Sequence, residues 1–357
     1  MTDLRDLLEA EVATGAVPGA AALVARGGVV EIAAAGDVRP DSIVRIASIT
    51  KPITAAALMV LVDDGVVALG DPVDRWLPEL SSPVVVRTPE SEVDDVVPAA
   101  RAVTVEDLLT FRAGWGFPSA FSLPAAVELF QRLPVFGVRE TPDEWLATLA
   151  RVPMLHHPGE AWLYNTCSDI QGVLIARASG RPLPEFLAER VFAPLGMDDT
   201  GFHVPAEKLD RLSAYHAPDA GPKIDAGLWT SPPIFPSGAG GLVSTLADWH
   251  RFGKMLLAGG GGVLSRESVR QMTTDHLTQE QRDAATLFLE GDGWGFGGSV
   301  GADGRYGWVG GTGTTAHLVA STGTVGVLLT QLQMTGPTPT PVMRRFWQYA
   351  FASSGRR

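Results

Sequence analysis

An apolar run from Ile53 to Val62 constrains the fold of this chain more than any other stretch. Pro52 precedes the run, and proline is tolerated in the first turn of a helix but disrupts a helix further in. Asp63-Asp64-Gly65 follows the run, and glycine is the residue that most often ends a helix. The sequence therefore predicts a helix that begins at Pro52 and ends in a glycine cap.

Ser48 and Lys51 stand at the start of this predicted helix and form a Ser-x-x-Lys motif. Residues three apart share a face of a helix, so the Lys51 amine is expected beside the Ser48 hydroxyl. The Ser48 N–H belongs to the unpaired donors of a helix start, which suit an oxyanion. The chain has only four lysines, and lysine, unlike arginine, can lose its proton to assist a serine. The pattern favours a serine nucleophile over the alternative, a solvated lysine in a capped first turn.

Charge and composition exclude several classes of function. The net charge is −12 and no basic stripe is present, so nucleic acid is not an expected partner. Cys167 is the single cysteine, and no cluster of residues suggests a metal or another cofactor. Residues 1–10 predict an acidic amphipathic helix without the apolar core of a signal peptide, and no apolar run reaches about 18 residues. We expect a cytoplasmic protein that does not associate with membranes.

The remaining chain alternates between predicted strands and helices. Residues 81–100 lack a helical period and are expected to form an exposed excursion. The predicted strands cover 19–36 (two strands around a Gly-Gly turn), 293–300, 306–309, 316–321 and 325–331; the predicted helices start at Thr104, Thr141, Asp169 and Pro182 and cover 246–257, 266–272 and 341–352. This order predicts a discontinuous α/β domain, 1–80 and 206–357, with an inserted mainly helical domain, 81–205.

Two further stretches are candidates for the same chemistry. Tyr164 follows a turn, and a cation near a tyrosine favours the phenolate, which can act as a general base; the alternative is a half-buried core tyrosine. Residues 306–315 are rich in glycine and threonine around Trp308, and glycine in a strand permits close approach of a ligand or a second backbone. The Gly311 N–H is therefore a candidate second oxyanion donor, although a purely structural glycine-rich hairpin fits the pattern equally well.

A Gly-x-Ser-x-Gly sequence around Ser299 offers a competing nucleophile. Such an elbow requires a strand before the serine, a helix after it, and an acid and a histidine downstream. Here Ala302-Asp303-Gly304 predicts a hairpin turn, and His317 is the only later histidine. The context argues against Ser299.

Taken together, Ser48-x-x-Lys51, Tyr164-x-Thr166 and Trp308-x-Gly310 resemble the serine β-lactamase and penicillin-recognising enzyme superfamily. The similarity is greatest to its class C-like branch, in particular the family VIII carboxylesterases, and covers nearly the whole chain. It implies an α/β (α+β) fold of the β-lactamase/transpeptidase type, with an antiparallel sheet flanked by helices and a helical insert. It also implies roles for residues. Ser48 would be the acylated nucleophile, Lys51 would hold its hydroxyl and tune Tyr164, and Tyr164 would be the general base and later the acid to the leaving group. The N–H groups of Ser48 and Gly311 would form the oxyanion hole, and Thr166, Trp308 and Gly310 would take part in substrate binding.

Two departures from the lactamase pattern bear on the substrate. Thr166 replaces the asparagine of Tyr-x-Asn, and Trp308 replaces the cation that would pair with a substrate carboxylate. We therefore expect an esterase of small acyl esters that acts through acyl-Ser48, with a small ester or amide as its only predicted partner. A β-lactamase or D-amino-acid amidase, with Arg305 as the substitute cation, and an acyltransferase with the same acyl-enzyme are the alternatives. A non-catalytic relative would be expected to lack Lys51 or Tyr164, and both are present.

Overall fold

A seven-stranded antiparallel sheet forms one side of the computed structural model, which describes residues 3–135, 137–218, 220–223 and 229–351. The strand order is β2-β1-β13-β12-β11-β10-β9, so the N-terminal hairpin joins strands from the end of the chain. The predicted antiparallel sheet flanked by helices is confirmed. The strands are β1 (Gly19–Arg26), β2 (Val29–Gly36), β9 (Gly293–Trp294), β10 (Ser299–Val300), β11 (Arg305–Gly310), β12 (Thr314–Val319) and β13 (Thr324–Leu329).

Helices cover both faces of this sheet. Gly253 of α9 (Leu246–Leu257) packs against Val325, whereas Gly326 packs against Phe346 and Ala350 of α13 (Pro341–Phe351). Consecutive residues of a strand point to opposite faces, so α9 and α13 lie on opposite sides of β13. All residues of β12 and β13 are buried as a result.

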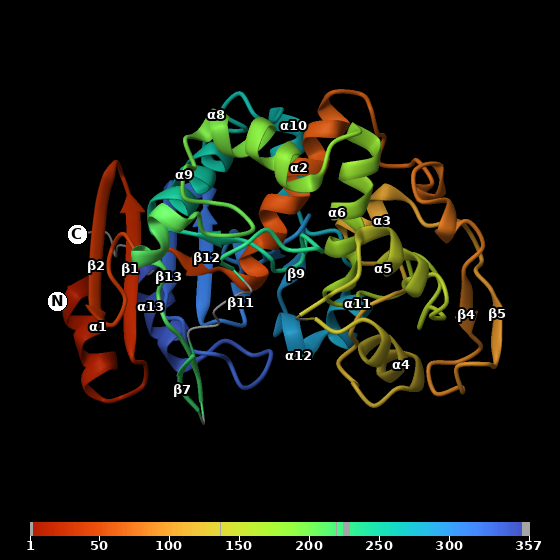
Figure 1. Ribbon diagram of the computed structural model, residues 1–357, viewed down its shortest axis with the longest axis horizontal. Coiled ribbons are helices and arrows are strands. Elements are labelled where there is room, and N and C mark those ends of the chain that lie inside the picture. Colours follow the sequence, from red (N-terminus) through yellow and green to blue (C-terminus); the bar gives the residue numbers. More distant parts are fainter. Residues whose placement is uncertain (1–2, 136, 219, 224–228, 352–357) are drawn as a thin grey trace.

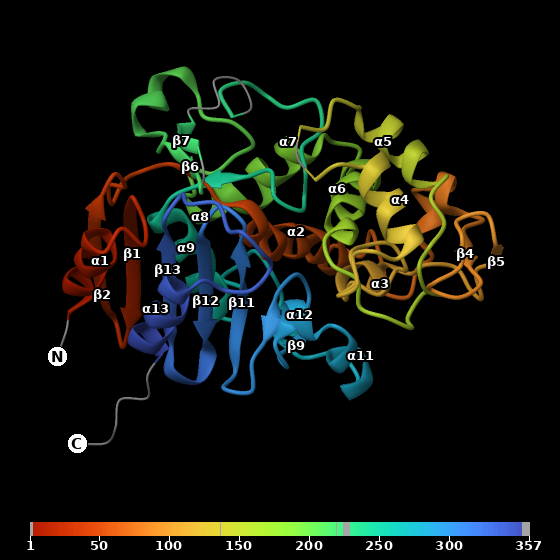
Figure 2. The same cartoon turned by 90° about the horizontal axis from the view of Figure 1, so that it is seen from below.

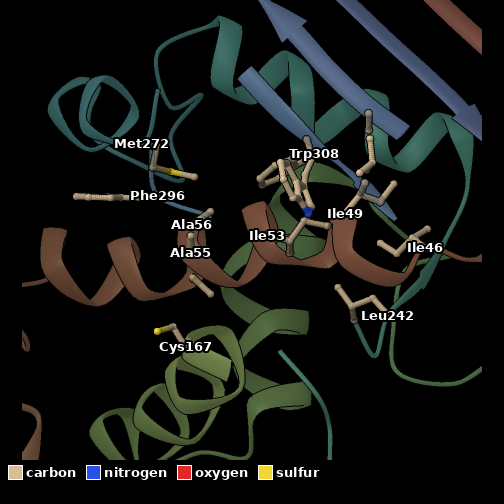
Figure 3. Close-up of a cluster of buried hydrophobic side chains, with 14 of the residues drawn as sticks. Ile46, Ile49, Ile53, Ala55, Ala56, Cys167, Leu242, Met272, Phe296 and Trp308 are labelled. Carbon is tan, nitrogen blue, oxygen red and sulfur yellow. The ribbon is translucent and has the colours of Figure 1, made fainter. Parts of the chain in front are cut away.

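Helix α2 (Lys51–Asp63) crosses the middle of the molecule, between the sheet and a group of helices that includes α6 (Thr166–Ser179) (Figure 1). Every residue from Lys51 to Leu61 is buried, as expected for a helix that is apolar on all sides. Trp308 lies against the side of α2 that carries Ile53, next to Ile49 in the turn that precedes the helix, and Cys167 lies against the other side of α2 (Figure 3). The helix predicted at Pro52 is confirmed, and its first residue is Lys51.

The remaining elements complete the helical side and its edges. Strands β4 (Val84–Val86) and β5 (Val96–Pro98) form a hairpin at the end of the molecule farthest from β1 and β2 (Figure 2). The other elements are α1 (Leu4–Ala13), α3 (Val105–Leu109), α4 (Pro124–Arg132), α5 (Pro142–Leu149), α7 (Leu183–Leu187), α8 (Ala193–Leu195), α10 (Arg266–Met272), α11 (Gln279–Ala284), α12 (Thr286–Leu289), β3 (Val44–Arg45), β6 (Tyr215–Ala217), β7 (Ala220–Lys223) and β8 (Val243–Ser244). No described helix has the length and apolarity that a membrane span needs.

Among the differences from the sequence-based prediction, two concern strands. The excursion at 81–100 contains the β4–β5 hairpin, and the strand predicted at 293–300 is divided into β9 and β10. The division follows from Gly297, whose positive φ of 76° reverses the chain where it approaches the Lys51 carbonyl. An added Cβ at Gly297 would lie 2.6 Å from that oxygen, so only glycine fits there. The proposed domain division at residues 81 and 205 stays a prediction.

Candidate active site

Ser48 lies in a single 3₁₀ turn, Ala47–Thr50, that leads directly into α2. The hairpin of β11 and β12 holds this turn: Thr314 donates a hydrogen bond to the Ile46 carbonyl at 2.9 Å. At Gly310 the two backbones are so close that an added Cβ would lie 2.5 Å from the same carbonyl and 3.3 Å from the Ser48 nitrogen. Gly310 therefore acts by letting strand β11 approach the Ser48 turn, and it does not line the cavities described below.

The Lys51 amine lies beside Ser48, as the spacing predicts. Its Nζ is 2.9 Å from Ser48 Oγ, 2.9 Å from Asn165 Oδ1 and 2.7 Å from the Ala239 carbonyl oxygen. Burial lowers the pKa of Lys51 to about 7, and the nearby Asp169 carboxylate acts in the opposite direction. A substantial fraction of Lys51 is therefore neutral near pH 7.

The three partners of Lys51 fix the direction of its lone pair. The Asn165 and Ala239 oxygens can only accept hydrogen bonds, whereas the Ser48 hydroxyl can accept or donate. A neutral amine has two N–H donors and one lone pair, so the two N–H groups satisfy the two carbonyl oxygens. The lone pair then faces the Ser48 hydroxyl, in the orientation needed to accept its proton.

Tyr164 completes the polar group around Ser48. Trp308 Nε1–H donates to the Tyr164 hydroxyl at 2.8 Å, and Lys51 Nζ lies 4.6 Å from the centre of the Tyr164 ring. Burial raises the pKa of Tyr164 to about 12, although hydrogen bonds with Ser48 and Trp308 act to lower it. The expectation that the lysine cation pushes Tyr164 toward phenolate is wrong, because burial raises this pKa and Lys51 is not among the groups that lower it. Near pH 7 Tyr164 is protonated.

Asn165, whose Oδ1 accepts a hydrogen bond from Lys51, was not singled out in the sequence, because the lactamase pattern has its asparagine two residues after the tyrosine, where this chain has Thr166. Its φ of 82° and ψ of −66°, with a Thr166 N–H to Tyr164 carbonyl bond of 3.2 Å, define a strained γ-turn. Strain of this kind is typical of functional sites. Asn165 lines both cavities beside Ser48, whereas Thr166 lines neither and is buried at the start of α6. The sequence signal that could have identified Asn165 is an asparagine one residue after Tyr164, one position earlier than in the Tyr-x-Asn pattern.

Asp169 is a second residue that the sequence did not single out. It lies one turn into α6, and its Oδ1 accepts hydrogen bonds from Ser237 Oγ at 2.7 Å and from the Ala239 N–H at 3.1 Å. The Ala239 carbonyl is in turn a partner of Lys51. Burial raises the pKa of Asp169, and its hydrogen bonds with Ser237 and Ala239 act to lower it. Asp169 thus fixes the loop that holds one side of the Lys51 amine.

Two backbone N–H groups beside Ser48 are available to a substrate oxygen. Within the described part of the chain, neither the Ser48 N–H nor the Gly311 N–H donates a hydrogen bond to the protein. The Gly311 carbonyl accepts from the Met334 N–H at 2.8 Å, which fixes this part of the loop after β11. Ser48 and Gly311 line the same two cavities, so both donors border the space where a substrate carbonyl would lie.

Two cavities meet at Ser48. The Phe235 cavity has a volume of about 140 Å³ and is lined mainly by apolar side chains and glycines, among them Phe202, Trp229, Pro233, Phe235, Gly240 and Gly241. The Phe288 cavity has a volume of about 270 Å³ and is lined by Phe117, Phe121, Phe130, Tyr164, Phe288, Trp308 and Met334. None of the described lining residues is charged. Arg305, the cation considered above, lies over the Trp347 ring at 4.5 Å and lines neither cavity.

Comparison with known proteins agrees with this geometry. The sequence matches the beta-lactamase family over residues 4–345. An uncharacterized protein of Mycobacterium tuberculosis is 42% identical over 274 residues, which are 74% of this chain and 67% of that protein. Esterase EstB of Burkholderia gladioli is 36% identical over 211 residues, which are 56% of this chain but only 50% of EstB.

Among solved structures, EstCE1, described as a hydrolase with promiscuous acyltransferase activity, superposes with a TM-score of 0.81. The superposition covers 97% of this chain and 96% of EstCE1 at 22% sequence identity, and it confirms the β-lactamase/transpeptidase-like fold. The resemblance seen in the three sequence motifs is confirmed as well, because the family match extends over nearly all residues. The chain belongs to the beta-lactamase family.

Proposed function

We propose that this protein hydrolyses small carboxylic esters through an acyl-Ser48 intermediate. The observation that carries the proposal is the Ser48 hydroxyl itself, 2.9 Å from a buried amine and at the junction of two uncharged cavities. The broader prediction of a serine hydrolase agrees with the family match and with the esterase relative.

Acylation of Ser48 begins with the neutral Lys51 amine. As Ser48 Oγ attacks the ester carbonyl carbon, its proton passes to Lys51 Nζ, and the carbonyl oxygen becomes an oxyanion held by the N–H groups of Ser48 and Gly311. The tetrahedral intermediate then expels the alcohol oxygen, which takes a proton from the Tyr164 hydroxyl, and the proton on Lys51 restores Tyr164. This assigns the first proton transfer to Lys51, whereas the sequence alone suggested Tyr164.

Deacylation repeats these steps with water as the nucleophile. Water occupies the space that the alcohol has left and attacks the acyl carbon, while its proton passes to the Tyr164 oxygen and the Tyr164 proton passes to Lys51. Ser48 then leaves with the proton from Lys51. An alcohol bound in the same space would instead accept the acyl group. Acyl transfer is therefore the second candidate activity, supported by the apolar lining of the Phe288 cavity, which suits an alcohol better than water.

The uncharged lining supports an ester over a β-lactam. A β-lactam of the penicillin or cephalosporin type carries a carboxylate, and a hydrogen bond to a charged group contributes about 1.5–3 kcal/mol. No described residue of either cavity offers a cation to that carboxylate. We expect kcat/KM for p-nitrophenyl butyrate to exceed that for nitrocefin by at least about tenfold. Steady-state kinetics on both substrates test this, and a higher value for nitrocefin would make the protein a lactamase.

The Trp308 indole is expected to assist Tyr164 directly. Trp308→Phe keeps an aromatic ring but removes the N–H that donates to the Tyr164 hydroxyl. That bond strengthens when Tyr164 gives its proton to the leaving oxygen, because a hydrogen bond to an anion is the stronger one. We expect kcat for p-nitrophenyl butyrate to fall by about 10-fold, the equivalent of about 1.4 kcal/mol.

Trp347→Phe is the matched control for this substitution. The Trp347 indole N–H donates to Thr315 Oγ1 at 3.0 Å, a bond of similar length that lies outside both cavities. The control should leave kcat within about twofold of the original protein. Equal losses of kcat in the two variants would show that the Trp308 effect is one of general packing.

A further inference from the structure

A third cavity lies behind the wall of the Phe235 cavity. This Phe192 cavity has a volume of about 540 Å³, the largest of the cavities described here. Its wall includes the apolar residues Ile43, Pro184, Phe192, Val204 and Val243, together with the charged residues Glu185, Asp198, Asp199 and Lys208. Phe202 and Pro233 line both the Phe235 cavity and the Phe192 cavity. These two residues therefore separate the space beside Ser48 from a much larger space whose wall is mainly apolar.

The local backbone holds the Phe202 ring in place. The preceding residue, Gly201, pairs with Val243 through two backbone hydrogen bonds of 2.8 and 3.2 Å. The Phe202 ring packs against Gly241, where an added Cβ would lie 3.0 Å from the ring carbon Cδ1. Phe202 is only 3% exposed. The ring is thus a fixed wall, with no room to turn toward Gly241.

The position of Tyr164 assigns the two halves of an ester to the two cavities at Ser48. Given the proposed function, on which this inference rests, the leaving oxygen must lie near the Tyr164 hydroxyl, and Tyr164 lines the Phe288 cavity but not the Phe235 cavity. The alcohol half then occupies the Phe288 cavity, among the rings of Phe117, Phe121 and Phe130. The acyl half extends the opposite way, past Gly240 and Gly241, toward Phe202.

The volumes of the two cavities limit the size of the acyl half and of the alcohol half of the ester. A cavity of about 150 Å³ holds one benzene molecule, so the Phe235 cavity, at about 140 Å³, accepts an acyl chain of about six carbon atoms. The Phe288 cavity has nearly twice this volume, and its entrance carries the exposed rings of Phe121 and Phe130. We propose that Phe202 limits the acyl chain and that the substrates are esters of short acyl groups with larger, apolar or aromatic alcohols.

Phe202→Ala tests this proposal because it joins the Phe235 cavity to the Phe192 cavity. Two series of esters are measured with both proteins: p-nitrophenyl esters with 2 to 12 acyl carbons, and acetates of alcohols with 2 to 10 carbons. In the original protein, kcat/KM should decrease beyond about six acyl carbons. In Phe202→Ala the ratio of kcat/KM for the decanoate to that for the butyrate should rise by at least about tenfold. One methylene group accepted by an apolar pocket already raises kcat/KM by about that factor. The alcohol series should keep its profile within about twofold.

Phe130→Ala is the matched control, because it removes a ring from the Phe288 cavity alone. It should change the alcohol profile and leave the acyl profile unaltered. Phe202→Leu is a milder change of the same buried ring and should raise the ratio of decanoate to butyrate kcat/KM by a smaller factor. It replaces Phe202→Ala in the test if circular dichroism shows that Phe202→Ala is not folded.

Two results would overturn the inference, and they differ from a failure of the proposed function. A decanoate ratio that stays within twofold in both Phe202 variants would show that Phe202 does not limit the acyl chain. A change confined to the alcohol series would show that the two halves bind the other way round. Absence of Ser48-dependent turnover in the original protein on both series would instead refute the proposed function, and the inference with it.

Discussion

Replacing Ser48 with alanine is expected to lower kcat for p-nitrophenyl butyrate by at least about 10⁴-fold, the largest effect of any single change in this protein. The substitution removes the atom that forms the acyl-enzyme and leaves the N–H donors of residues 48 and 311 in place. Loss of the nucleophile in serine hydrolases removes most of the rate enhancement. The rate enhancement that remains comes from the oxyanion hole and from substrate binding. The fold should persist, because Ser48 contributes one hydroxyl at the edge of a cavity.

Ser299→Ala is the control, since Ser299 is the serine of the competing Gly-x-Ser-x-Gly pattern. In the structure Ser299 lies in the short strand β10, and its hydroxyl donates to the Gly307 carbonyl at 3.3 Å within the sheet. A hairpin turn follows this strand, where an elbow would require a helix. The control should retain most of the activity. Loss of activity in Ser299→Ala, with full activity in Ser48→Ala, would move the nucleophile to Ser299.

The sequence predicts the Ser48–Lys51 pair well because the pair is a local feature. Pro52 and the apolar run define the start of α2, and helical geometry then brings two side chains three positions apart onto one face. The sheet hairpins are predicted for the same reason: a Gly-Gly turn joins β1 and β2, and short strand-forming runs separated by turns mark β11 to β13. Neighbours in sequence determine all of these features.

The rest of the site depends on contacts between distant segments, which a local pattern does not contain. Asn165 approaches Lys51 only because the chain forms a strained γ-turn before α6, and the usual spacing pointed to Thr166. Asp169 reaches Lys51 through Ser237 and Ala239, about 70 residues farther along the chain. The protonated state of Tyr164 likewise follows from its burial, which the sequence could not supply, so the expectation of a phenolate was wrong.

Lys51→Met is expected to lower kcat/KM by about 10³-fold, because the proposed proton acceptor for Ser48 is lost. Positioned general bases contribute about 10²- to 10⁴-fold. Methionine retains a flexible apolar chain of similar length in the buried space of Lys51, so the packing of α2 should be preserved. The matched control is Lys254→Met, since Lys254 is exposed on α9 and distant from both cavities. Its kinetics should be unchanged.

The pH dependence of kcat/KM distinguishes a proton acceptor from a structural lysine. Burial lowers the pKa of Lys51 to about 7, so below pH 7 the amine is protonated and cannot accept the Ser48 proton. The rate should therefore rise with pH through an apparent pKa near 7 and then remain level, since Tyr164, with a pKa raised to about 12, stays protonated as the acid. Profiles of both proteins from pH 5.5 to 9 test this. In Lys51→Met the inflection near 7 should be absent; a variant that is slower but keeps the inflection would show that Lys51 positions Ser48 without taking its proton, and that another group titrates.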